Sequence, residues 1–111
     1  MAKLSSKLRS WVFGDREGLS FFCPACNAAH TILTTAGGWE WDGDVDRPTF
    51  TPSVKVTHEA KPDASDEFKE WRTARVCHSY VTAGMIQYLA DCTHGLAGQT
   101  VELAVWPANY G

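Results

Sequence analysis

The sequence contains no long apolar run and no excess of basic residues. Its 111 residues include no stretch close to the roughly 20 apolar residues that a membrane-spanning helix needs. The start of the chain also lacks the continuous apolar segment of a secretory signal, so we expect a cytoplasmic protein. Ten Lys and Arg against thirteen Asp and Glu give a formal charge of −3. Nucleic-acid-binding proteins usually carry a clustered excess of Lys and Arg, which disfavours that class of partner.

The composition is that of an ordinary globular domain. Hydrophobic residues make up 44% of the chain and charged residues 21%, which excludes a fully disordered or collagen-like protein. Internal repeats and low-complexity tracts are absent. The length predicts a single domain over residues 1–111. The core of such a domain is modest, and small domains often add a metal ion or disulfides to it.

Short apolar or alternating stretches, separated by turn signals, predict a mainly β fold of short antiparallel strands. Residues 1–17 predict an N-terminal helix or strand, because their apolar residues follow helical spacing. Residues 59–74 predict a charged surface excursion in which Ser65 caps one short helix. Strands are expected at 19–22, 30–33, 39–41, 54–57, 75–81, 85–90 and 101–104. The predicted class is therefore a compact, mainly β domain of the small α+β type.

Four cysteines in a reducing compartment indicate a metal site rather than disulfides. Cys23 and Cys26 form a C-x-x-C directly after a predicted strand, and the two-residue spacer lets both thiolates reach one zinc ion. Pro24 and Asn27 suit the tight turn that this requires. A redox C-x-x-C would begin a helix in a βαβ pattern, which the sequence does not show. The pattern predicts a zinc-ribbon-like knuckle.

A closed structural zinc site needs two further ligands. Cys77 and Cys92 flank the predicted hairpin and complete a four-cysteine site, with His94, His78 and His30 as rivals for the fourth position. Adjacent residues of a strand face opposite ways, so Cys77 and His78 can both bind the metal only if the strand breaks between them. Pairing across the hairpin turn places Cys92 two residues away from Cys77 on the facing strand. The alternative is that Cys77 and Cys92 are small buried core residues.

Asp42, Asp44 and Asp46 form a D-x-D-x-D pattern that also occurs in calcium loops. A calcium loop of this type needs Gly at its sixth position and Glu at its twelfth, where this sequence has Arg47 and Ser53. We therefore interpret the pattern as an acidic turn. The negative patch that would contact a basic partner consists of Glu40, Asp42, Asp44 and Asp46.

The common signatures of zinc-dependent catalysis are missing. Neither the H-x-E and P-C-x-x-C pattern of zinc deaminases nor the H-E-x-x-H motif occurs. Two weaker hypotheses place a catalytic site in the second half of the chain. The first is a nucleophilic Cys77 or Cys92 paired with His78 or His94. The second is a hydrolytic site in which His78, Asp91 and His94 surround a metal ion with an open coordination position.

Several motifs occur together between about Gly18 and Pro107. The first half contains Phe21-Phe22-Cys23-Pro24-x-Cys26, Trp39-x-Trp41-x-Gly43 and Arg47-Pro48-Thr49-Phe50-x-Pro52-Ser53. The second half contains Cys77-His78-Ser79-Tyr80-Val81 and Asp91-Cys92-Thr93-His94. In this combination the sequence resembles a family of small uncharacterised proteins of tailed phages and prophages. The resemblance implies a phage origin, the cytoplasm of a host bacterium and a small metal-stapled domain.

Proteins of that family often carry the label ammonia monooxygenase, which the lack of a membrane span and of a copper site excludes here. The sequence thus predicts a small phage-encoded protein with a structural Zn²⁺ ion. We expect it to act by binding another protein of the host or the phage, such as a host defence or regulatory protein, rather than as an enzyme. The first alternative is a small zinc-dependent hydrolase that uses His78 or His94. The second is a zinc ribbon that binds nucleic acid.

Overall fold

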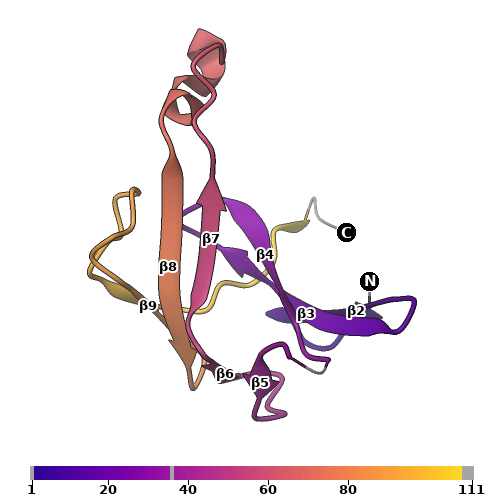
Figure 1. The fold of residues 1–111 in the computed structure, drawn as a ribbon. Helices are drawn as coiled ribbons and strands as arrows, with labels where there is room; N and C mark the ends of the chain where they lie inside the picture. Colours follow the sequence, from indigo (N-terminus) through magenta and orange to yellow (C-terminus); the bar gives the residue numbers. More distant parts are fainter. Residues whose placement is uncertain (1, 36, 109–111) are drawn as a thin grey trace.

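The strands of the protein form three antiparallel sheets in a computed structural model that describes residues 2–35 and 37–108 (Figure 1). The first sheet has the order β1-β2-β3-β4, with β1 (Ala2–Lys3), β2 (Leu8–Phe13), β3 (Arg16–Cys23) and β4 (Ala28–Leu33). The second has the order β10-β9-β8-β7, with β7 (Val54–His58), β8 (Arg75–Thr82), β9 (Met85–Tyr88) and β10 (Thr100–Glu102). The third pairs β5 (Glu40–Trp41) with β6 (Phe50–Thr51).

All three sheets contribute to one buried cluster of apolar side chains. Its members include Leu8, Leu19, Phe21 and Ile32 from the first sheet, Phe50 from the third, and Val54, Cys77, Val81, Ile86 and Tyr88 from the second. Along β8 the burial alternates, so Cys77, Ser79 and Val81 are buried while the residues between them face outward. Each large side chain buried in this way stabilises the fold by about 1.5–3 kcal/mol.

The predicted mainly β class is confirmed, and the expected strands all have counterparts within the described residues. The segment 1–17, whose first residue lies outside the description, forms strands rather than a helix. The helix expected in 59–74 is η1 (Asp66–Arg72), a 3₁₀ helix that is irregular at Phe68, with φ −118° and ψ 33°.

No α-helix occurs among residues 2–35 and 37–108, which corrects the α+β part of the prediction. Ser65 precedes η1 but its side chain makes no capping hydrogen bond. η1 has only seven residues, most of them charged, and a helix this short is only marginally stable, so it does not extend beyond one or two turns. None of the described helices is long or apolar enough to cross a membrane.

The β8–β9 turn is joined to the segment that leads into β6 and β7. The backbone N–H of Gly84 donates to the Pro48 carbonyl (3.0 Å), and that of Ala83 donates to Thr49 Oγ1 (2.8 Å). The Arg47 guanidinium donates to the Ala83 carbonyl (3.3 Å). These bonds tie the segment just before β6 to the turn of the β8–β9 hairpin, although the two are more than 30 residues apart.

The close approach at Gly84 predicts a stability difference between two glycine substitutions. Gly84 has φ +79°, and a Cβ there would lie 2.9 Å from the Arg47 Cα, whereas Gly98 has φ +78° and open space around it. The left-handed backbone costs either alanine about 1–2 kcal/mol. We expect Gly84→Ala to lose at least about 1 kcal/mol more than Gly98→Ala in urea unfolding, because the Arg47 backbone must move. Equal losses would contradict the close contact.

Candidate functional site

The C-x-x-C knuckle is the turn between β3 and β4. Cys23 is the last residue of β3 and pairs with Ala28, the first residue of β4. Asn27 adopts a positive φ of 52°, which an asparagine tolerates better than most residues. His30 lies two residues beyond Ala28, so its side chain is on the same face of the sheet as Cys23. This face points into the core, where His30 is buried.

Cys77 approaches the knuckle from the second sheet and completes a cluster of four possible metal ligands. The ligand atoms of Cys23, Cys26, His30 and Cys77 all lie within 4.8 Å of one another. The sulfur atoms of Cys23 and Cys77 are 3.9 Å apart. Two sulfurs bound to a tetrahedral ion at about 2.3 Å would be separated by about 3.8 Å. These four residues therefore fit a metal ion, which would cross-link the two large sheets.

The buried imidazole of His30 supports this fit. Within the described part of the chain, its Nε2 atom is buried and has no hydrogen-bond partner. Leaving a buried polar atom unpaired costs about 1–3 kcal/mol, so such an atom calls for an explanation. A metal ion bound between His30 and the three thiols would supply the missing partner.

The thiols are arranged to share a negative charge. Hydrogen bonds from Cys26 and Cys77 hold the pKa of Cys23 far below its ordinary value. The same contact with Cys23 raises the pKa of Cys26 to about 11, and contacts with both cysteines raise the pKa of Cys77. The Tyr88 hydroxyl lies 3.1 Å from the Cys23 sulfur. Burial raises the pKa of Tyr88, so the phenol stays protonated and donates a hydrogen bond to that sulfur. A bound metal ion would stabilise the remaining thiols as thiolates.

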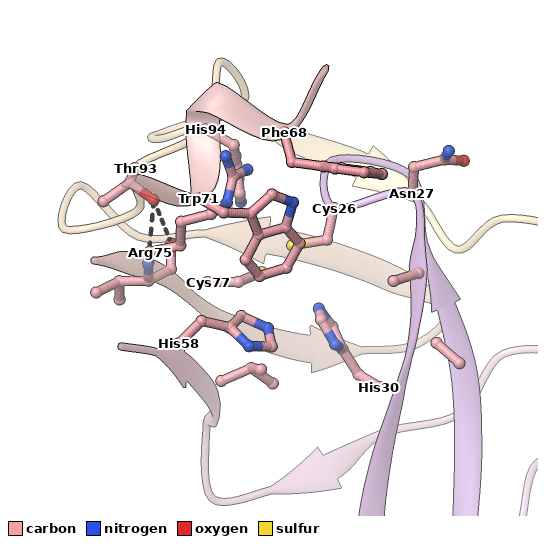
Figure 2. A pocket seen from close by; sticks show the side chains of 14 residues that line it. Cys26, Asn27, His30, His58, Phe68, Trp71, Arg75, Cys77, Thr93 and His94 are labelled. Atoms are coloured by element: carbon pink, nitrogen blue, oxygen red, sulfur yellow. Dashed lines mark hydrogen bonds between the residues drawn. The ribbon is translucent and has the colours of Figure 1, made fainter. Parts of the chain in front are cut away.

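A cavity of about 450 Å³ opens beside the cluster. Figure 2 shows Cys26 and Cys77 at the back of this cavity, behind the indole ring of Trp71. Trp71 belongs to η1, and its ring meets the His58 ring edge-on at 4.9 Å between centroids. The Arg75 guanidinium lies 5.5 Å from the centre of the same indole. The excursion predicted at 59–74 therefore supplies one wall of the cavity over the sulfur atoms.

The structure brings three of the four predicted metal ligands together with one of the histidines considered for the fourth position. Cys23, Cys26 and Cys77 lie with His30, whereas Cys92 forms a second group with Cys77 and His94. Cys92 does not lie where simple hairpin pairing places it. The ladder between β8 and β9 ends at Tyr88, and the chain then turns so that the Cys92 N–H donates to the Leu89 carbonyl. The choice of Cys92 as the fourth ligand stays a prediction, and His30 is the donor with the better geometry.

His94 and His78 are less suited to bind the metal. The backbone N–H of Leu96 donates to His94 Nδ1 (3.2 Å), and burial lowers the pKa of His94. A neutral imidazole that accepts at Nδ1 carries its proton at Nε2, which therefore cannot donate a lone pair to a metal. β8 is unbroken between Cys77 and His78, so His78 points to the opposite face of the sheet.

On that opposite face, His78 connects a serine to an aspartate. Its Nε2 atom is 2.9 Å from Ser53 Oγ, and its Nδ1 atom is 3.0 Å from Asp91 Oδ2. With Nδ1–H donating to the carboxylate, Nε2 is left with a lone pair that accepts the Ser53 hydroxyl proton. This is the order of contacts in a Ser-His-Asp triad, which is recognised by geometry rather than by sequence position.

Strand register explains how these three residues meet. Lys55 of β7 pairs with His78 of β8, and Ser53 lies two residues before Lys55 on the same face. Asp91 follows β9, the strand on the other side of β8. Three neighbouring segments thus deliver the serine, the histidine and the aspartate in that order across the sheet.

The surroundings keep the triad residues in place and Asp91 charged. The hydrogen bond from His78 holds the pKa of Asp91 below its usual range, and Lys55 adds a smaller effect of the same sign. Because the pKa is lowered, the charged interaction is present at neutral pH and is lost only as the pH falls below the usual carboxyl range. The Trp39 indole N–H donates to the Ser53 carbonyl (3.1 Å), which fixes the backbone of the serine.

Ser53 is a functional candidate that the sequence alone does not indicate. In the sequence, His78 and Asp91 suggest only ligands of a catalytic metal, together with His94. Ser53 ends the Arg47–Ser53 motif and stands where a calcium loop would need Glu. The spacing of the three residues carries no signal, because unrelated proteases bring the same triad together from different sequence orders.

The predicted acidic patch is organised by its own backbone. Asp42 Oδ1 accepts hydrogen bonds from the N–H groups of Asp44 and Thr49, and Asp44 Oδ1 accepts from those of Asp46 and Arg47. The two backbone bonds to Asp44 hold its pKa below the usual value. These hydrogen bonds show that Asp42 and Asp44 stabilise the conformation of the loop itself. A partner for the exposed patch, which includes Glu40, stays a prediction.

Comparison with known proteins identifies a family. A model of the family described as bacterial ubiquitination-like system serine protease (BubE) matches residues 3–89, which is most of the chain. The matched range includes Ser53 and His78 and ends just before Asp91. No match was found among curated proteins or among solved structures.

This match corrects two interpretations of the sequence. The resemblance to uncharacterised phage proteins is wrong, and with it the phage origin that it implied. A function limited to binding another protein is also wrong, because the matched family is one of proteases. The alternative of a zinc-dependent hydrolase agrees better with the matched family, because proteases are hydrolases. The family description, however, places catalysis on a serine rather than on a metal ion.

The cluster geometry predicts which histidine the bound metal requires. We expect His30→Ala to lose most of its bound metal and to unfold at a lower temperature, because the fourth donor of the cross-link is removed. His94→Ala is the matched control, since it removes the neighbouring imidazole and should keep the metal. Elemental analysis of the purified proteins, combined with thermal unfolding, measures both effects. Full metal content in His30→Ala would contradict the proposed ligand set.

Proposed function

Because the chain belongs to the bacterial ubiquitination-like system serine protease (BubE) family, we propose that it hydrolyses peptide bonds with Ser53, His78 and Asp91. The observation that carries this proposal is the pair of contacts on His78, 2.9 Å to Ser53 Oγ and 3.0 Å to Asp91 Oδ2. Family membership supplies the serine chemistry, and these distances supply the residues that perform it.

In this mechanism His78 first acts as the general base. It takes the hydroxyl proton of Ser53 as Oγ attacks the carbonyl carbon of the substrate, and then gives that proton to the leaving amine. The product of this half-reaction is an ester between Ser53 and the acyl part of the substrate. A water molecule then attacks the ester carbonyl, with His78 again taking and returning the proton. Free enzyme and a carboxylic acid result.

Asp91 orients the imidazole and stabilises its charged form. Its carboxylate accepts the Nδ1–H bond, which holds His78 in the tautomer that accepts from Ser53. When His78 gains a proton, the negative charge of Asp91 offsets the new positive charge. The lowered pKa of Asp91 keeps the carboxylate ionised at neutral pH for this role.

The position of the triad favours a polypeptide substrate. The side chain of His78 is 22% exposed and that of Asp91 is 49% exposed, so the site lies on an open face of the sheet. Ser53 directly precedes β7, which is an edge strand among the described residues. An edge strand can pair with an extended segment of a partner. We propose such a segment of a protein in a ubiquitination-like system as the substrate.

We further propose that the metal is a structural Zn²⁺ ion held by Cys23, Cys26, Cys77 and His30. Three thiolates and one imidazole form a donor set that zinc favours in closed, four-coordinate sites. The ion would supply stability by joining the two large sheets. The triad lies on the opposite face of β8 from these ligands, so the peptide bond is hydrolysed without contact with the ion.

A fluorophosphonate probe, which phosphonylates activated serines, tests the triad without knowledge of the substrate. We expect the wild-type protein to be labelled at Ser53, and Ser53→Ala and His78→Gln to lose labelling. Asp91→Asn should label more slowly by on the order of 10⁴-fold, because the imidazole tautomer is no longer fixed.

Matched controls are Ser10→Ala and Asp15→Asn, which change the same residue types on the first sheet and its turn. Both should label at the wild-type rate. Peptide mapping identifies the modified residue, and metal content together with circular dichroism shows that each variant is folded. Absence of labelling in the folded wild-type protein, or labelling that persists in Ser53→Ala, would refute the assignment.

A further inference from the structure

Part of β8 has no neighbouring strand on the side of β9. The β8–β9 ladder runs from Thr82 and Met85 to Ser79 and Tyr88, and the Leu89 N–H still donates to the His78 carbonyl (2.9 Å). Beyond this point the chain turns away. The N–H groups of His78 and Val76, which face this side, would otherwise be left without acceptors, at a cost for each.

Cys92 satisfies the backbone of His78. The His78 N–H donates to the Cys92 sulfur (3.2 Å), and the Cys92 thiol donates to the His78 carbonyl (3.2 Å). Cys92 is only 9% exposed. One buried side chain therefore supplies the acceptor that β9 does not offer to the His78 N–H, and adds a second donor to the His78 carbonyl.

Thr93 does the same for Val76. The Val76 N–H donates to Thr93 Oγ1 (3.0 Å), the Thr93 hydroxyl donates to the Val76 carbonyl (3.3 Å), and the Thr93 N–H donates to that carbonyl as well (3.0 Å). Figure 2 shows the two side-chain bonds as dashed lines beside Arg75. The segment after Asp91 is thus joined to β8 by the side chains of Cys92 and Thr93 and by one backbone bond from Thr93.

We propose that Cys92 and Thr93 are positioning residues that hold Asp91 against His78, an inference that rests on the proposed protease function. Asp91 is on an exposed turn, and its contact with His78 would have to overcome the conformational freedom of that turn. Cys92 and Thr93 follow it directly and fix both the turn and the backbone of His78. They therefore set the distance between the carboxylate and the imidazole.

This role separates Cys92 from the metal cluster. A thiol that donates to the His78 carbonyl keeps its proton, whereas a metal-bound sulfur has none to donate. Cys92 is adjacent to Asp91 and acts on the same residue, His78, from the backbone side. Asp91 thus holds His78 at its ring, and Cys92 holds it at its peptide groups.

The test compares variants that remove these hydrogen bonds with variants that keep them. Cys92→Ala and Thr93→Val remove them, whereas Cys92→Ser and Thr93→Ser retain a hydroxyl in the same place. Thr82→Val, at the other end of β8, is the control for Thr93→Val. Three quantities are measured on each protein: the labelling rate with a fluorophosphonate, the metal content, and the NMR signal of the His78 Nδ1 proton, assigned by its loss in His78→Gln.

We expect Cys92→Ala and Thr93→Val to label about 10–100-fold more slowly, because a displacement of about 1 Å in a catalytic group costs about 100-fold. Their His78 Nδ1 proton signal should weaken through faster exchange with water. Cys92→Ser and Thr93→Ser should recover most of both quantities. All of these variants should keep the metal content of the wild-type protein.

Two results would overturn the inference. One is an unchanged labelling rate and an unchanged Nδ1 proton signal in both Cys92→Ala and Thr93→Val. The other is loss of metal from Cys92→Ala together with a normal labelling rate in Thr93→Val. If the wild-type protein is not labelled at all, the protease proposal fails, and the Nδ1 proton signal alone then decides whether Cys92 and Thr93 position Asp91 and His78.

Discussion

The alternation of side chains along β8 is the constraint on which the two candidate sites depend. Cys77 and His78 are adjacent, and an unbroken strand must point them to opposite faces. Cys77 faces inward and meets the knuckle of the first sheet, while His78 faces outward between Ser53 and Asp91. A shift of the register by one residue would exchange the two environments and destroy both. The candidate metal site and the proposed catalytic site are thus positioned by one strand.

The cysteine–histidine cluster and the triad have different proposed roles, stability for the cluster and catalysis for the triad. The core is shared among three sheets of short strands, and the Cys23–Cys77 contact lies where the two large sheets meet. A metal ion at that point would hold the position of β8, from which His78 projects on the other side. The triad itself uses hydrogen bonds: Trp39 fixes the backbone of Ser53, and Asp91 fixes the imidazole. In the proposed mechanism, a metal ion would therefore support the triad through β8 rather than through direct contact.

Local patterns made the fold and the knuckle predictable. Alternating and apolar stretches separated by turns indicated the strands, and the two-residue spacer between Cys23 and Cys26 indicated a metal turn. The expected position of Cys92 opposite residue 75 was wrong, because the β8–β9 pairing ends at Tyr88, where the chain turns. The family inferred from short motifs was also wrong. Such motifs do not show which residues meet in space, so they could not reveal the triad.

The sequence by itself determined the mainly β class, the knuckle, and the presence of Cys77 in a strand with His78 beside it. Only the tertiary structure decided that His30 lies with the three thiols and that Ser53 lies beside His78. The physical reason is that Cys77 meets the knuckle, and Ser53 meets His78, through contacts between segments far apart in the chain. Ser53 and His78 are joined by the pairing of Lys55 with His78, and Asp91 by the turn after β9. No spacing in the sequence encodes such contacts.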